Sequence, residues 1–116
     1  MKLAVLISGG GSNLQAFIDW AADGRLSAEI AVVISNKAGV YGLDRADQAG
    51  ISTAVVDHRE FDSRESFDQA LVDTLAPFEV DLVILAGFMR ILTPVFIAPF
   101  TGRLLNIHPS LLPKYP

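Results

Sequence analysis

The chain has 116 residues, of which 51% are hydrophobic, so it has the length of one domain and enough apolar side chains for a sizeable core. Its formal net charge is −4, and no run of lysine or arginine offers the positive stripe that nucleic-acid binding requires. With no cysteine and only two histidines, the sequence predicts neither a disulfide scaffold nor a cysteine nucleophile nor a metal site.

The first apolar run, residues 3–7, ends at a glycine cluster. It is too brief for a signal peptide with its cleavage site or for a membrane span. We therefore expect a cytoplasmic protein without a membrane partner. The expected partners are small-molecule substrates, and a small anion could bind at a local positive site.

Short β-branched runs alternate with helical patterns along the whole chain. Strands are predicted at residues 3–7, 30–34, 53–56, 80–85 and 103–107. Most of these runs are continuously hydrophobic, which is typical of parallel strands buried on both faces of a sheet.

Four helices are predicted between these strands. The first places apolar residues at helical spacing from Leu14 to Ala22 and closes at Gly24, and the second covers residues 42–48. The third begins after Asp62 or Ser63 and stops before Pro77, and the fourth is a short helix that begins at residues 93–94. This order predicts an α/β fold: a doubly wound, mainly parallel sheet with helices on both faces.

Three unusual segments lie at the ends of predicted strands. They are residues 8–13 after the first strand, residues 87–90 after the fourth, and Asn106 with His108 on the fifth. Open α/β sheets bind ligands outside the carboxyl ends of their strands, near the point where the strand order reverses. If strands one, four and five are neighbours, the three segments converge on one cleft.

Residues 8–13, SGGGSN, have the composition of a phosphate-binding turn. Glycines allow a sharp turn and a close approach to an anion, the following helix presents free N–H groups, and Ser12 and Asn13 add side-chain donors. The turn is not a P-loop, because no Gly-Lys-Ser/Thr follows. It does not match the dinucleotide-binding fingerprint either, because Leu14 takes the place of the third glycine and the second strand ends at residues 35–36 without an acidic residue. A mononucleotide-like or sugar phosphate fits better; the alternative is an ordinary tight turn.

Asn106 and His108 are two residues apart, so on a strand their side chains face the same way. An amide can donate to a developing oxyanion while an imidazole moves a proton, and acyl transfer needs both. Pro109 and Pro113 stiffen the segment that follows. The alternative is a strand end with a satisfied histidine and a proline-rich turn.

Residues 88–92 place apolar bulk, with Arg90 among it, where a turn would normally be polar. Part of this bulk belongs to the core, but a flat heterocycle with an acidic tail would need such a pocket. Arg64, at the start of the third helix, is either a bidentate partner for a carboxylate or a solvated helix residue. We assign His58 to a surface loop. Four carboxylates are assigned to solvated helix faces: Asp44, Asp47, Asp68 and Asp73.

Three runs together resemble the phosphoribosylglycinamide formyltransferase family: GSNLQA at 11–16, LAGFMRIL at 85–92 and LNIHPSLLPKYP at 105–116. The resemblance covers essentially the whole chain. The last run alone is shared with methionyl-tRNA formyltransferase and formyltetrahydrofolate hydrolase, so it indicates only the formyltransferase superfamily. The Gly-Ser-Asn loop points to the enzyme of purine biosynthesis.

The resemblance implies a reaction in which a formyl group passes from 10-formyltetrahydrofolate, the cosubstrate, to the amine of glycinamide ribonucleotide, without metal or covalent intermediate. It implies that the substrate phosphate is held by Gly11, Ser12 and Asn13. Asn106 would stabilise the oxyanion and His108 would donate the proton. The folate-binding residues would be Arg64, on the glutamate tail, together with Met89, Arg90, Ile91, Leu92 and Asn106.

The family also has an aspartate downstream of the histidine that raises the pKa of that histidine, and this chain ends at Pro116. We therefore expect residues 1–116 to be the N-terminal, mononucleotide-binding part of a formyltransferase domain, with the C-terminal part absent. Such a part would be inactive alone and prone to self-association through the strand edge at 103–107. Two alternatives stay open: another folate-dependent formyltransferase or formyl-folate hydrolase, and a non-catalytic nucleotide-binding module.

Overall fold

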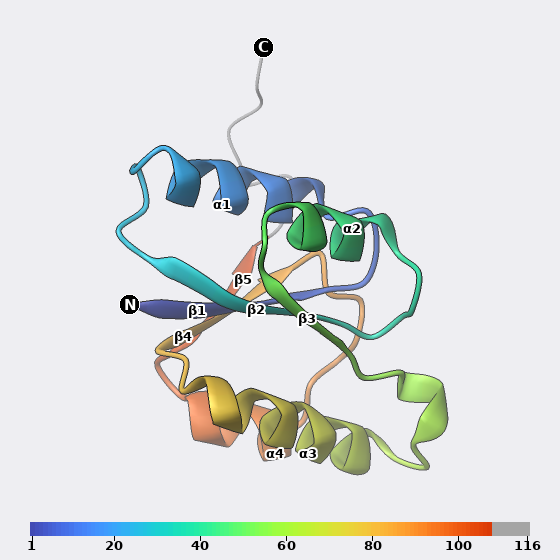
Figure 1. The fold of residues 1–116 in the computed structure, drawn as a ribbon. Coiled ribbons are helices and arrows are strands. Elements are labelled where there is room, and N and C mark those ends of the chain that lie inside the picture. The colour runs from blue at the N-terminus through green and yellow to red at the C-terminus, as the bar shows by residue number, and fades with distance from the viewer. Residues whose placement is uncertain (108–116) are drawn as a thin grey trace.

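A five-stranded parallel sheet lies between two layers of helices in the computed structural model, which describes residues 1–107 (Figure 1). The strands are β1 (Lys2–Ile7), β2 (Glu29–Ser35), β3 (Ser52–Val55), β4 (Leu82–Ala86) and β5 (Leu104–Ile107). The helices are α1 (Ser12–Ala22), α2 (Tyr41–Gln48), α3 (Arg64–Leu75) and α4 (Pro94–Ile97), with short 3-10 helices η1 (His58–Glu60), η2 (Ala76–Phe78) and η3 (Ala98–Phe100).

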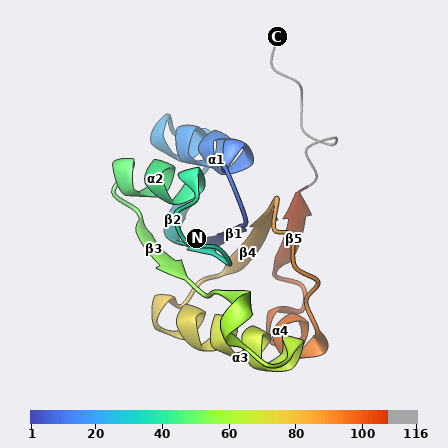
Figure 2. The same ribbon diagram turned by 90° about the vertical axis from the view of Figure 1, so that its right-hand side faces the viewer.

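The strand order is β3-β2-β1-β4-β5, and every pair of neighbours is parallel. Helices α1 and α2 cover one face of the sheet and α3 and α4 the other, while β3 and β5 lie at opposite edges (Figure 2). The direction of winding therefore reverses between β1 and β4. The doubly wound α/β prediction is confirmed, and its switch point falls between these two strands.

The helix starts follow the local sequence. Ser63, rather than Asp62, caps α3, because its hydroxyl accepts from the Ser66 N–H while the Ser66 hydroxyl accepts from the Ser63 N–H. Thr93 caps α4, and Pro94 occupies the first turn, where its missing N–H costs nothing. At α1 the N-cap is Gly11, in the left-handed region at φ 76°.

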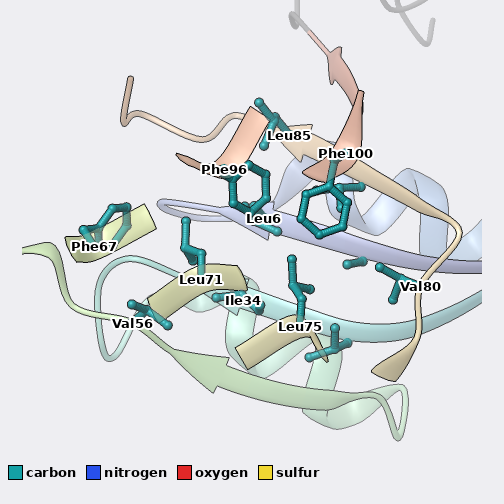
Figure 3. Close-up of a cluster of buried hydrophobic side chains, with 13 residues drawn as sticks. Leu6, Ile34, Val56, Phe67, Leu71, Leu75, Val80, Leu85, Phe96 and Phe100 are labelled. Carbon is teal, nitrogen blue, oxygen red and sulfur yellow. The ribbon is translucent and has the colours of Figure 1, made fainter. Parts of the chain in front are cut away.

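Two hydrophobic clusters, one on each face of the sheet, form the core. The cluster beneath α3 and α4 joins strand residues such as Leu6 and Leu85 to Phe67, Leu71 and Phe96 from the helices (Figure 3). The other cluster joins the opposite side chains of the same strands to α1 and α2, through Leu3, Val5, Ile7, Leu14, Phe17, Ile18, Val33, Ala46 and Ile84.

Burial on both faces holds for β1, β2 and β4 but not for the outer strands. In β3 only Ala54 is half-buried, and in β5 the Leu105 side chain is 49% exposed. Both are edge strands of the described sheet, so each has a neighbour on one side only. Within residues 1–107 no helix has the length and apolar character needed to cross a membrane.

Candidate active site at the carboxyl edge of the sheet

The described parts of the three unusual segments meet at the carboxyl edge. Leu6 of β1 pairs with Leu85 of β4, and Leu85 pairs with Asn106 of β5, so the strands that carry the segments are immediate neighbours. The loops after β1 and β4 are also bonded directly, because the Met89 N–H donates to the Ser8 hydroxyl oxygen at 2.8 Å. The condition under which these segments were expected to converge, that strands one, four and five are neighbours, is fulfilled.

The backbone of residues 9–11 has its carbonyl groups bound and its amide groups free. The carbonyls of Gly9, Gly10 and Gly11 accept, in order, from the Gly42 N–H at 3.1 Å, the Arg45 Nε at 2.7 Å and the Gln15 N–H at 2.8 Å. The N–H groups of residues 10–13 donate to no acceptor within the described part of the chain. A row of free N–H groups at a helix N-terminus, with no acidic residue in the first turn of α1, is suited to bind an anion.

Glycine is required at two positions here, one on each side of a close contact. Gly11 has a positive φ, and a Cβ on it would lie 2.8 Å from the Gly42 Cα. A Cβ on Gly42 would in turn lie 2.8 Å from the Gly9 carbonyl oxygen. Gly9 and Gly10 have open space around them, so the conformational need for glycine predicted for the whole cluster holds only for Gly11.

The loop between β4 and α4, residues 87–92, is anchored at both ends and apolar in the middle. Near its start, Met89 is bonded to Ser8, and just beyond its end the Thr93 N–H and hydroxyl both donate to Asp68 Oδ2 at 2.6 Å. Between these anchors Met89 and Ile91 are 77% and 71% exposed. Two large exposed apolar side chains on a fixed loop form a surface on which a flat apolar ligand can lie.

Asp68 was predicted on a solvated helix face, and this prediction is wrong. Its side chain is fully buried on α3, next in sequence to Phe67 and near Leu71 of the core. The carboxyl group is accommodated because it binds both donors of Thr93, although its other oxygen, Oδ1, has no partner among the described residues. Helical periodicity alone gave no signal of this, since the partner lies far along the chain.

A second buried polar chain runs across the edge from β4 toward β3. The Ser8 hydroxyl, which accepts from Met89, donates to Asn36 Oδ1 at 2.5 Å, and the Asn36 amide nitrogen lies 3.1 Å from His58 Nδ1. Ser8 and Asn36 are both buried. His58 was predicted in a surface loop; it lies in the short 3-10 helix η1, half-buried, with Asn36 as its hydrogen-bond partner. The sequence offered one signal of this contact, because Asn36 is a polar residue directly after the buried strand β2.

The neighbouring carboxylate, Asp57, is bound by Arg59. Its side chain accepts from the Arg59 guanidinium at 2.8 and 3.1 Å and from the Arg59 N–H at 3.0 Å. These bonds lower the pKa of Asp57 to about 2, so it stays ionised at neutral pH.

The other predicted site residues lie around the same edge. Arg64 is the first residue of α3; it is exposed and has no ion pair with any residue from 1 to 107. One turn later Phe67 stacks on Phe88, with ring centroids 6.5 Å apart, so the start of α3 adjoins the 87–92 loop. Asn106 is exposed on β5. His108, the predicted proton donor, lies outside the described residues.

The edge thus combines a backbone anion site, an exposed apolar loop and an amide on the strand beside it. Ser12 is exposed and Asn13 half-buried at the anion site, and Arg90 and Leu92 are half-buried in the loop. Gly42 and Arg45, which hold the glycine loop, were missed from the sequence because nothing in their own surroundings marks a contact with residues 9–11.

The chain matches a protein-family model described as formyl transferase over residues 1–116. It is 53% identical over 116 residues to the phosphoribosylglycinamide formyltransferase of Escherichia coli (strain K12), covering 100% of this chain and 55% of that protein. It is 54% identical over 114 residues to the human trifunctional purine biosynthetic protein adenosine-3, covering 98% of this chain and 11% of that protein.

A solved structure is similar over the same extent. The crystal structure of glycinamide ribonucleotide transformylase 1 from Symbiobacterium toebii superposes with a TM-score of 0.91 at 47% identity, covering 100% of this chain and 55% of the other. The chain therefore spans about half the length of the single-function relatives that it matches.

Proposed function

The chain belongs to the formyl transferase family, and from that membership we propose a function in purine biosynthesis. We propose that the chain takes part in transferring a formyl group from 10-formyltetrahydrofolate to the amine of glycinamide ribonucleotide, in the cytoplasm. The observation that supports this choice is the meeting of three features at one edge of the sheet. They are the free N–H groups of residues 10–13, the exposed apolar loop 87–92, and Asn106 on β5, the strand beside β4.

The anion site suits the phosphate of the acceptor. Gly11, Ser12 and Asn13 bind it through backbone N–H groups at the start of α1 and through the two side chains. The absence of an acidic residue in the first turn of α1 leaves the positive end of the helix dipole available to a dianion. Position 11 requires glycine because α2 packs closely against the loop there.

The apolar loop suits the heterocycle of the formyl donor. Met89 and Ile91 offer exposed apolar side chains, and Arg90 and Leu92 add to this surface from half-buried positions. Arg64, exposed beside this loop at the start of α3, pairs with the carboxylates of the glutamate tail.

The transfer is direct. The acceptor amine attacks the formyl carbon, a new C–N bond forms, the bond from that carbon to the folate nitrogen breaks, and the amine proton is passed to the departing nitrogen. The Asn106 amide donates to the oxyanion of the tetrahedral intermediate, and His108 supplies the proton to the leaving group. The fixed loops hold the two reactants against each other, which removes much of the entropic cost of a bimolecular reaction.

The test uses the full-length gene product that contains these 116 residues. It is incubated with 10-formyltetrahydrofolate and, in separate reactions, with glycinamide ribonucleotide, with initiator methionyl-tRNA or with water alone as the acceptor. The proposal expects rapid loss of the formyl donor only with glycinamide ribonucleotide. Equal rates with water alone would indicate a formyl-folate hydrolase and would contradict the proposal, as would preference for the tRNA.

A further inference from the structure

The glycine loop is held in place by one long side chain from another helix, Arg45 of α2. Its Nε donates to the Gly10 carbonyl at 2.7 Å, and its Nη1 donates to the Gln15 side-chain oxygen at 3.1 Å. Its guanidinium carbon lies 4.6 Å from the centre of the Tyr41 ring. No carboxylate within residues 1–107 forms an ion pair with Arg45. The guanidinium is therefore fixed by three contacts and directed at a single backbone carbonyl.

The bonded carbonyl belongs to a peptide unit that has little else to fix it. The Gly10–Gly11 peptide has glycine on both sides, so no Cβ restricts its rotation. Gly10 has no atom within 4 Å of the position of a Cβ, so the space beside its Cα is open. Rotation of this peptide would place a carbonyl oxygen where an N–H now lies.

The direction of the carbonyl determines the direction of the next amide. In a trans peptide the C=O and N–H bonds point to opposite sides, and the structure has no cis peptide among its described residues. With the Gly10 carbonyl bound to Arg45, the Gly11 N–H points away from the Arg45 guanidinium. A carbonyl turned to that side would repel a phosphate, whereas the N–H attracts it.

We propose that Arg45 is a positioning residue for substrate phosphate: its Nε–H fixes the Gly10–Gly11 peptide so that the Gly11 N–H faces the anion. The guanidinium lies on the carbonyl side of the peptide and is not itself a phosphate ligand. This inference rests on the proposed function, which assigns the glycine loop to the phosphate of glycinamide ribonucleotide.

Three substitutions separate the hydrogen bond from the charge. In Arg45→Gln the amide nitrogen lies the same number of bonds from Cα as Nε does, so a donor remains at that position without the charge. Arg45→Met has a side chain of the same length as that of glutamine but has no hydrogen-bond donor. Arg45→Lys keeps the charge but has a carbon in the place of Nε.

Binding of glycinamide ribonucleotide to the full-length gene product is measured by calorimetry, and KM and kcat by formyl transfer. We expect Arg45→Met and Arg45→Lys to weaken acceptor binding about tenfold, the effect of one hydrogen bond from a charged donor. Arg45→Gln retains most of the affinity. In all three variants the KM for the formyl donor and the kcat at saturating acceptor stay close to those of the parent.

A second readout does not depend on catalysis. Inorganic phosphate is titrated into ¹⁵N-labelled protein, and the amide signals of Gly10 and Gly11 are followed by NMR. The parent and Arg45→Gln proteins should show the Gly11 signal shifting with phosphate, while Arg45→Met should show a displaced Gly11 signal that responds only at higher phosphate. Thermal unfolding of the Gln and Met variants, matched in length and charge, controls for loss of the fold.

Each contrary result has a distinct meaning. Full affinity in Arg45→Met would refute any role for Arg45, and full affinity in Arg45→Lys with a loss in Arg45→Gln would show that charge, not peptide orientation, is what matters. A parent protein that binds neither phosphate nor glycinamide ribonucleotide would overturn the proposed function together with this inference. A parent that binds both but transfers no formyl group would overturn the proposed reaction and leave the role of Arg45 intact.

Discussion

Substituting Gly42 by alanine tests how closely α2 is seated on the glycine loop. Gly42 lies in the first turn of α2, where helix propensity alone favours alanine over glycine by about 0.5–1 kcal/mol. The structure predicts the opposite sign. An added Cβ would overlap the Ile7 side chain, lie 2.8 Å from the Gly9 carbonyl oxygen and lie 3.3 Å from the Gly11 Cα.

Two of these three neighbours are backbone atoms and cannot move aside as a flexible side chain can. Overpacking of this kind costs about 1–3 kcal/mol, so after the gain in helix propensity we expect a net loss of about 1–2 kcal/mol in the free energy of unfolding. The displaced helix should also weaken the Gly42 N–H bond to the Gly9 carbonyl and carry Arg45 away from Gly10. Phosphate affinity should therefore fall with stability.

The measurement is urea unfolding of the full-length gene product, followed by far-UV circular dichroism, with calorimetry of acceptor binding. Gly9→Ala is the matched control for stability, because Gly9 has open space around it and no positive φ. We expect the control to unfold at the same urea concentration as the parent and Gly42→Ala at a lower one. An equal or higher midpoint for Gly42→Ala would refute the close packing on which the account of the glycine loop depends.

Three further predictions concern the rest of the edge. Asn106→Ala should lower kcat by about 100–1000-fold, as removal of an oxyanion donor does, while the calorimetric affinity for glycinamide ribonucleotide stays unchanged. Asp68→Ala removes both hydrogen bonds to Thr93, so it should lower the free energy of unfolding by about 2 kcal/mol and raise the KM for the formyl donor. The control is Thr93→Ser, which keeps the hydroxyl and should leave the free energy of unfolding and this KM near the parent values. The 116-residue chain by itself should self-associate through β5 and lack formyl transfer activity. Leu105→Lys should lower the solution mass of this chain, as measured by light scattering. A parent chain that is monomeric and active would contradict this prediction.

The order of elements was predictable because it depends on local patterns. Continuous apolar runs for β1, β2 and β4 and the cap at Ser63 can be recognised within a few residues of sequence, and the observed bounds differ from the predicted ones by one or two residues. The meeting of the three segments followed from one further rule, that parallel strands share a carboxyl edge. What needed the structure was the strand order, which the sequence left as a condition.

The contacts that shape the site were not predictable from local patterns. Asp68 resembles any carboxylate on a helix, and only the fold places the donors of Thr93 beside it. His58 resembles a loop histidine, and Asn36, its partner, lies on another strand end. Arg45 is separated by 35 residues from the carbonyl that it binds. Each is a polar residue whose role depends on a partner distant in sequence, so periodicity and composition carry no information about it.

The same contacts explain how two irregular loops can serve as a fixed site. Neither the glycine loop nor residues 87–92 has a hydrogen-bond ladder of its own, so each takes its shape from an element packed on one face of the sheet: α2 on one face through Arg45, and α3 on the other through Asp68. Ser8 then joins the two loops across the switch point. Arg45 binds the glycine loop directly, whereas Asp68 binds Thr93, the residue that follows the 87–92 loop. Substitutions of Arg45 or Asp68 should therefore disturb ligand binding more than substitutions of equal thermodynamic cost near the amino ends of the strands.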